Sequence, residues 1–210
     1  MMNKKVIKAM YDYIVSKDQI RPNLMGVHFE KERCYATDTH ILAIYKYGSE
    51  KFDGQTVSVN GEKIKGNYPA IDRIIPKKLI NPLKVDFRQL RAACSWWAKQ
   101  SDHNPDDQVV LNGTVLNIRY LSRMLYLFSL TAELGSLTFY LNADASRPVV
   151  AVSESLTTLL MPCQLEDESR IDDERIDSEL ITISYANLIN TYALEICRPK
   201  TKKSEPMGWL

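Results

Sequence analysis

The 210-residue sequence lacks a long apolar run, because no stretch approaches the ~18 consecutive apolar residues of a membrane-spanning helix. Its first residues, MMNKKVIKAMYDYIV, carry lysine, tyrosine and aspartate where a signal peptide has a continuous apolar segment. We therefore expect a cytoplasmic protein without a membrane partner. The composition, 45% hydrophobic and 25% charged, is that of a globular chain long enough to bury a core.

Closely spaced metal ligands are also missing. The sequence has three histidines and no CxxC pair, and its four cysteines are far apart: Cys34, Cys94, Cys163 and Cys197. A zinc site needs ligands paired at short spacing, so the cysteines are expected to be reduced and partly buried thiols. We expect neither a metal nor an organic cofactor.

The common catalytic motifs are absent, since the sequence contains no G-x-S-x-G, no glycine-rich phosphate loop and no H-E-x-x-H. His28, Asp38 and His40 are close in sequence, but no nucleophile is predicted beside them. The sequence therefore predicts a protein that is not an enzyme.

Neither sign of charge dominates the whole chain, whose formal net charge is +1. The distribution is uneven: residues 166–179 (EDESRIDDERIDSE) contain eight acids and two bases, which leaves 25 bases and 18 acids elsewhere. A mildly basic folded part is compatible with a phosphate-binding surface but does not require one.

Hydrophobic periodicity predicts a first unit of one helix and several strands. The helix is expected over residues 4–17, where the apolar residues at helical spacing are Val6, Met10, Tyr13 and Ile14. Arg21-Pro22-Asn23 would end it. Alternating, β-branched and aromatic residues predict strands over residues 25–29, 33–36, 41–47 and 55–59. Residues 61–76 are punctuated by Gly, Pro and Asn and are predicted to be looped or extended.

A second unit is predicted to begin near Lys84 with a helix, because Asp86 and Gln89 have the spacing of a capping box. The buried stripe of this helix would be Phe87, Leu90, Cys94 and Trp97. Asn112-Gly113 between two apolar runs predicts a two-residue hairpin. A helix follows over 119–129, burying Leu121, Met124, Leu125 and Phe128, and then strands over 137–141, 149–152 and 157–161. This order predicts an α+β fold with antiparallel sheets and helices packed on one face.

The C-terminal part begins with residues that lack the apolar pattern of a buried element. Residues 166–179 are predicted to be a solvated linker, followed by a strand over 181–184 and a helix over 185–196 begun by Ser184. The chain closes with an apolar Met207-Gly208-Trp209-Leu210 on a polar leader. Such a segment could dock in the pocket of a neighbouring copy.

Three segments, RPNLMGVHFEKERCYATDTHILA (21–43), GNYPAIDRIIPK (66–77) and LLMPCQL (159–165), resemble motifs of the bacterial DNA polymerase III β sliding clamp family, in the family's order. The first matches RP-x-L-x-G-V and A-T-D-G-H-R-L-A, except that Thr39 replaces the usual glycine and Ile41 the usual arginine. The third resembles V-M-P-M-R-L, with Cys163 and Gln164 in place of Met and Arg. The resemblance spans residues 4–165.

The resemblance implies a DNA-clamp-like fold, in which residues 1–78 form a shortened domain and 79–165 a nearly complete one. Residues 166–210 would be an added acidic linker and tail. It also implies sequence-independent tethering to duplex DNA in replication or repair, assembly as a homo-oligomer, and docking of linear peptide motifs from polymerase or repair proteins. The alternative is an adaptor or decoy that keeps the clamp fold but does not encircle DNA. Oligomeric state would discriminate the two, because a monomer has too few helices to enclose a duplex.

Basic residues on the three predicted helices are the candidate DNA contacts. They are Lys4, Lys5 and Lys8 on the first helix, Arg88, Arg91 and Lys99 on the second, and Arg119 and Arg123, expected to point outward, on the third. Charge alone favours solvated helix faces, whereas the resemblance favours the DNA interpretation. Charge reversal of Arg88, Arg91, Arg119 and Arg123 is expected to weaken salt-dependent DNA binding.

Carried over by motif, the family's peptide pocket would be lined here by Thr37, His40, Leu42, Pro76, Leu159, Met161 and Pro162. Apolar groups beside sheet edges suit the capture of peptides. The alternative is that Leu42, Leu159 and Met161 are ordinary core residues and that His40 is a hydrogen-bonded structural histidine.

Overall fold

The computed structural model describes residues 3–99, 104–111, 114–131, 136–141, 147–163, 180–182 and 195–197. Its helices are α1 (Lys4–Tyr13), α2 (Phe87–Trp97) and α3 (Ile118–Ser129). The strands before α2 are β1 (Val27–Phe29), β2 (Cys34–Thr37), β3 (Ile41–Tyr45), β4 (Gln55–Val57), β5 (Lys63–Ile64) and β6 (Pro82–Asp86). The later strands are β7 (Gln108–Leu111), β8 (Thr114–Asn117), β9 (Ser136–Tyr140), β10 (Val149–Val152), β11 (Leu156–Leu160), β12 (Leu180–Thr182) and β13 (Glu195–Cys197).

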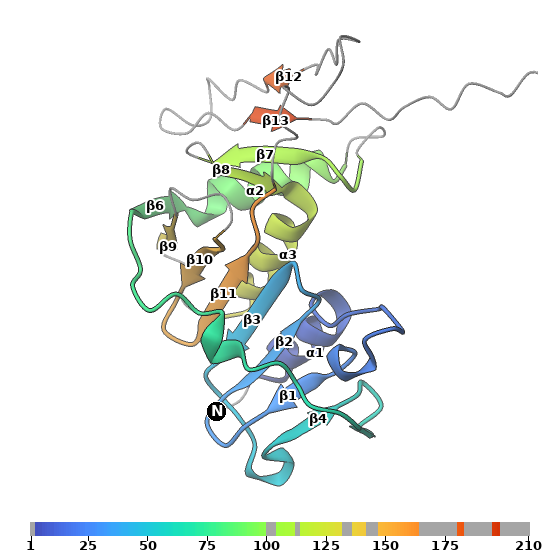
Figure 1. The fold of residues 1–210 in the computed structure, drawn as a ribbon. Coiled ribbons are helices and arrows are strands. Elements are labelled where there is room, and N and C mark those ends of the chain that lie inside the picture. The colour runs from blue at the N-terminus through green and yellow to red at the C-terminus, as the bar shows by residue number, and fades with distance from the viewer. Residues whose placement is uncertain are drawn as a thin grey trace, which may run out of the picture.

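Nine strands form one antiparallel sheet in the order β5-β4-β1-β2-β3-β11-β10-β9-β6. Its centre is the pairing of β3 with β11, in which Ile41–Tyr45 lie opposite Leu156–Leu160. This pairing joins the strands that follow α1 to those that follow α3 in a single layer (Figure 1). A second sheet has the order β12-β13-β7-β8. The expected α+β fold with antiparallel sheets is therefore confirmed.

Alternate residues of the large sheet are buried on opposite faces, as the pleat of a β-strand requires. One face packs against the helices: Ile41, Ala43 and Tyr45 of β3 belong to the same core cluster as the buried residues of α1, α2 and α3. The other face carries a smaller cluster, in which Leu42 and Ile44 are covered by side chains from residues 68–75. Helices thus cover one face of the sheet and an irregular segment covers the other.

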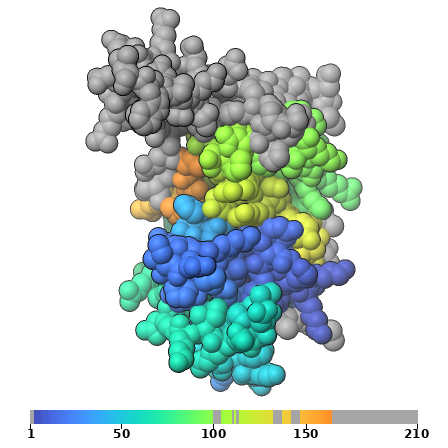
Figure 2. Space-filling view, turned by 90° about the vertical axis from the view of Figure 1, so that its right-hand side faces the viewer, coloured from blue at the N-terminus to red at the C-terminus, as the bar shows by residue number. Residues whose placement is uncertain are grey.

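Each helix begins at a residue whose side chain accepts a hydrogen bond from the first turn. Asn3 accepts from the amide of Lys5, Asp86 from that of Gln89, and Asn117 from those of Arg119 and Tyr120. Asn3 also donates through Nδ2 to the carbonyl of Leu130, at 2.9 Å, and so ties the start of α1 to the end of α3. Figure 2 shows the blue surface of α1 beside the yellow-green surface of α3.

Several predicted boundaries need correction. The first helix ends at Tyr13 rather than near residue 17, because the amide of Ser16 donates to the carbonyl of Leu24 as the chain turns back. The predicted loop 61–76 contains β5 and a 3-10 turn, Ile71–Arg73. Strand β6 was not predicted, and residues 195–197 form β13 where a helix was predicted.

Some predictions fall outside the described residues. These are the Asn112-Gly113 turn, although β7 and β8 do pair as a hairpin, the linker 166–179, residues 185–194 of the predicted helix and the tail 207–210. Within the described ranges, no helix has both the length and the apolar character needed to cross a membrane.

Candidate interaction site where the β2–β3 turn meets helix α3

The turn between β2 and β3 is held by its own polar side chains. Asp38 accepts through Oδ1 from the amides of His40 and Ile41, each at 3.0 Å. Thr37 donates its hydroxyl to the carbonyl of Ile41, at 2.7 Å, and accepts from the amide of Thr39. Thr39 adopts a φ of 83°, a left-handed conformation that a β-branched residue rarely takes. The turn leaves the His40 side chain exposed and Asp38 Oδ2 facing α3.

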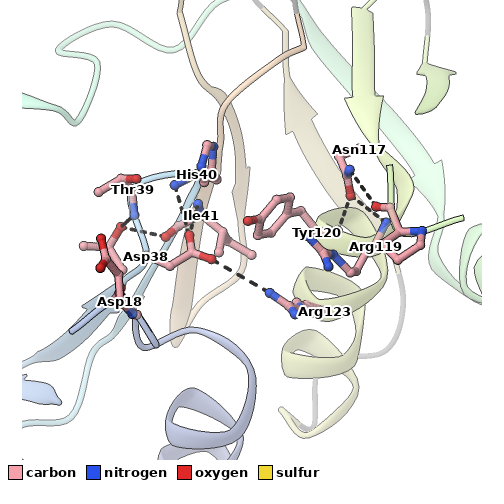
Figure 3. A network of polar contacts seen from close by, with 12 residues as sticks. Asp18, Asp38, Thr39, His40, Ile41, Asn117, Arg119, Tyr120 and Arg123 are labelled. Carbon is pink, nitrogen blue, oxygen red and sulfur yellow. Dashed lines mark hydrogen bonds and ion pairs between the residues drawn. The ribbon is translucent and has the colours of Figure 1, made fainter. Parts of the chain in front are cut away.

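Helix α3 meets this turn through an aromatic side chain. The Tyr120 ring stacks on the His40 ring, with centroids 5.4 Å apart and planes inclined by 28°. The guanidinium carbons of Arg119 and Arg123 lie 5.3 Å and 5.2 Å from the Tyr120 centroid, within the range of cation–π attraction. Arg123 Nη1 lies 3.8 Å from Asp38 Oδ2, which makes an ion pair without a hydrogen bond (Figure 3).

We call this group the Tyr120 cluster; its members are Asp38, His40, Arg119, Tyr120 and Arg123. Burial and then the nearby Asp38 carboxylate raise the pKa of the Tyr120 hydroxyl, so the ring carries a neutral hydroxyl at physiological pH. The cluster therefore combines two permanent cations with a single carboxylate. In the sequence, Asp38 was noted only as a residue of the first clamp-like motif and as a neighbour of His28 and His40, and Tyr120 was not singled out.

A helical signal for Tyr120 does exist in the sequence. Residues 119, 120 and 123 are separated by one, three and four positions, and the last two spacings place side chains next to each other on a helix. An aromatic residue flanked by two arginines at these spacings could have indicated a surface cluster rather than a core position.

The segment after β11 borders the same site. The amide of Met161 donates to the carbonyl of His40, and the amide of Cys163 donates to that of Val115 in β8, both at 2.9 Å. These two bonds fix the backbone of Met161–Cys163 between the turn and β8. Met161 is 36% exposed and Pro162 is half-buried, so an apolar side chain remains accessible beside His40.

The remaining residues of the predicted peptide pocket lie deeper. Leu42 and Leu159 are paired across β3 and β11 and are only 5% and 3% exposed, on the sheet face away from the helices. Thr37 is buried and Pro76 is half-buried. The structure thus brings His40, Met161 and Pro162 together at the surface, whereas Leu42 and Leu159 sit in the smaller core cluster.

An ion-pair network holds the segment that covers this cluster. Arg33 donates from Nη1 and Nη2 to the two carboxylate oxygens of Asp72, at 2.8 Å and 2.9 Å, and also bonds Glu30. The Arg33 guanidinium holds the pKa of both carboxyl groups below their usual values. In the same segment, Tyr68 accepts through its hydroxyl oxygen a hydrogen bond from the amide of Thr37, at 3.0 Å. The segment is thereby tied to both ends of the β2 strand.

The predicted DNA contacts divide into two groups. Those on α1, on α2 and just after α2 are exposed: Lys4, Lys5, Lys8, Arg88, Arg91 and Lys99. Lys8 Nζ bonds Asp12 at 2.6 Å, which raises the pKa of Lys8 and balances part of its charge. Arg119 and Arg123 are half-buried over Tyr120, so the expectation that they point freely outward is wrong. Both arginines lie beside the β2–β3 turn, and helical periodicity in the sequence gives no indication of this tertiary contact.

The large antiparallel sheet with helices packed on one face gives the chain a fold like that of a DNA clamp. Among solved structures, the chain is similar to the β sliding clamp of C. crescentus, with 17% identity and a TM-score of 0.63 over 77% of this chain and 64% of that one. It is also similar to the DNA polymerase III β subunit of Borrelia burgdorferi, with 17% identity and a TM-score of 0.61 over 79% of this chain and 62% of that one. The clamp of Bartonella birtlesii bound to griselimycin is 16% identical, with a TM-score of 0.60 over 77% of this chain and 64% of that one.

The TM-scores of 0.60–0.63 show a shared clamp-like fold, and identities of 16–17% show no more than the fold. No protein-family profile matches the sequence, and no curated protein is a significant match. The chain spans 62–64% of the length of these three clamps.

Proposed function

We propose that this protein is a non-enzymatic, clamp-like DNA-binding protein that tethers itself to duplex DNA without reading its sequence. The observation that carries the proposal is the set of exposed cations on α1 and α2, two helices that both pack against α3 on the same face of the sheet. Lysine and arginine on helices meet phosphates without contacting base edges, which gives binding without sequence preference.

The proposal extends to assembly and to partners. One chain contributes three helices in its described residues, too few to surround a duplex, so the DNA-bound form would be a homo-oligomer. We propose the boundary between its two clamp-like units near residue 78. Peptides from polymerase or repair proteins would dock beside His40, Met161 and Pro162, where an apolar side chain is accessible next to a rigid backbone.

A titration of labelled duplex DNA across salt concentrations tests the DNA-binding part. The double variant R88E/R91E should lose most of its affinity and show a shallower dependence of log K on log salt, since two phosphate contacts are removed. The matched control is K77E/K78E, which reverses two exposed lysines in the segment outside the helices. Equal affinity in the wild type and in R88E/R91E would contradict the proposal.

One observation favours the second candidate, an adaptor or decoy that does not encircle DNA. Among the side chains of α3, the central helix, Tyr126 alone is exposed, at 39%, and the two arginines of the helix are half-buried over Tyr120. The middle of the helical face therefore offers no freely exposed cation. Mass measurement in solution separates the two functions: a monomer at micromolar concentration, with and without DNA, supports the adaptor.

A further inference from the structure

Among the described residues, the Arg119 guanidinium has no ion pair with a carboxylate. Its Nε–H is buried and donates no hydrogen bond within that part of the chain, and its guanidinium carbon lies over the Tyr120 ring. Buried donors in folded proteins are nearly always paired, because an unpaired one loses its bonds to water without replacement. An unpaired, half-buried cation is therefore a group that gains from an incoming anion.

The neighbouring carboxylate does not satisfy this need. Asp38 Oδ1 is occupied by two backbone amides, and Oδ2 faces Arg123 at 3.8 Å. Among the described residues, Arg123 contacts Asp38 through that long ion pair and lies over the Tyr120 ring. Two guanidinium groups thus lie close to one aromatic ring, and the Asp38 carboxylate is on the side of Arg123 (Figure 3).

We propose that the Tyr120 cluster binds a carboxylate of an acidic linear peptide whose apolar side chain lies against Met161. This inference rests on the peptide docking proposed above and gives the chemistry of the partner. Guanidinium groups bind carboxylates through paired N–H donors, and Arg119 and Arg123 are one helical turn apart on α3, so both can face one acidic side chain. Met161 and Pro162 provide the apolar contact beside His40.

A peptide carboxylate fits the recessed position of these arginines better than a phosphate of duplex DNA. The Arg123 side chain is 26% exposed and both guanidinium groups lie over the Tyr120 ring, whereas the cations of α1 and α2 are exposed. A duplex is a stiff rod that meets protruding side chains, while an acidic side chain on a flexible peptide can reach partly buried cations. The exposed apolar side chain of Met161 would also find no apolar group to contact on a phosphate backbone.

Fluorescence anisotropy with the full chain tests the inference. The probes are two labelled, capped peptides that differ in one residue: aspartate followed by two leucines, and asparagine followed by the same leucines. The aspartate peptide should bind about fivefold to tenfold more tightly, the effect of one charge-assisted bond. Arg119→Gln and Arg123→Gln should bring the two affinities together, because the aspartate peptide then loses its charge-assisted bond. Arg88→Gln, on exposed α2, is the matched control.

Each result has a distinct meaning. Equal binding of the two peptides to the wild type would overturn the acidic preference and leave peptide docking intact. No binding of either peptide would overturn both the inference and the proposed docking. If Arg119→Gln weakened duplex DNA binding as much as Arg88→Gln does, without altering the peptide ratio, the cluster would be a phosphate site. Arg119→Lys, which keeps the charge without the planar donors, should retain part of the preference and checks that lost binding is not lost folding.

Discussion

Asp38 and Arg123 face each other between the β2–β3 turn and helix α3, with 3.8 Å between Asp38 Oδ2 and Arg123 Nη1. The pair links residues that are far apart in the chain, but it is long and partly solvated. Asp38 contributes more to the turn, through the two amides that its other oxygen accepts, than to the helix.

A double-mutant cycle should separate these roles. With Asp38→Asn and Arg123→Gln, we expect a coupling energy of about 0.5 kcal/mol in urea unfolding, since partly exposed ion pairs are weak. Asp38→Ala should cost about 1–2 kcal/mol, because the amides of His40 and Ile41 both lose their acceptor. A coupling energy of several kcal/mol would show that the ion pair, rather than the turn, is the dominant contact.

Thr39→Gly should stabilise the protein. Thr39 has a φ of 83°, which strains a side chain with a branched Cβ, and the hydrogen bond of its amide to Thr37 survives the substitution. The relief of strain exceeds the added entropy of glycine in the unfolded chain, for a net gain of about 0.5–1 kcal/mol by urea titration. Asn81→Gly at a φ of 50° is the control and should gain less, because asparagine adopts this region readily. A loss of stability in T39G would refute the strain argument.

The Arg33 network makes the covering segment sensitive to acid. The folded-state pKa values of Glu30 and Asp72 lie below their ordinary values of 4.5 and 3.8, with hydrogen bonds from Arg33 as the largest cause. Their stabilising effect is therefore complete above those values and is lost as pH falls through the lowered pKa values. Hydrogen exchange at the amides of Arg73, Ile74 and Ile75 should accelerate below about pH 4 relative to the β3 amides. In Arg33→Gln, exchange should already be fast at pH 7, and unchanged protection there would exclude the network as the cause.

Gly48 should not tolerate a side chain. A Cβ at this position would lie 1.8 Å from the carbonyl oxygen of Glu30 and 2.6 Å from the amide nitrogen of Arg33, both backbone atoms. Gly48→Ala should therefore destabilise the protein by on the order of 3 kcal/mol. Gly54→Ala meets open space and carries only the cost of a positive φ, about 1–2 kcal/mol. Equal losses at the two positions in thermal or urea unfolding would contradict the clash.

Local chemistry allowed much of the fold to be predicted from the sequence. The side chains of Asp86 and Asn117 begin helices, and the buried stripes of α2 and α3 follow the helical repeat, so both helices could be predicted within a few residues. Strand β6 was missed because Pro82 and Lys84 interrupt the apolar pattern of a strand. The strand forms through its pairing with β9, which the local sequence does not indicate. The site was harder to predict: the inward turn of Arg119 and Arg123 depends on the β2–β3 turn, which is distant in the chain.

The pairing of β3 with β11 at the centre of the large sheet can form only late in the synthesis of the chain. Tyr45 of β3 pairs with Leu156 of β11, so a nascent chain exposes one long side of β3 until residues 156–160 have left the ribosome. Unpaired strand edges and distant partners slow folding and invite association between incomplete chains. Truncations ending before residue 156 should accumulate as aggregates, and cellular holdases should engage the elongating polypeptide at this stage.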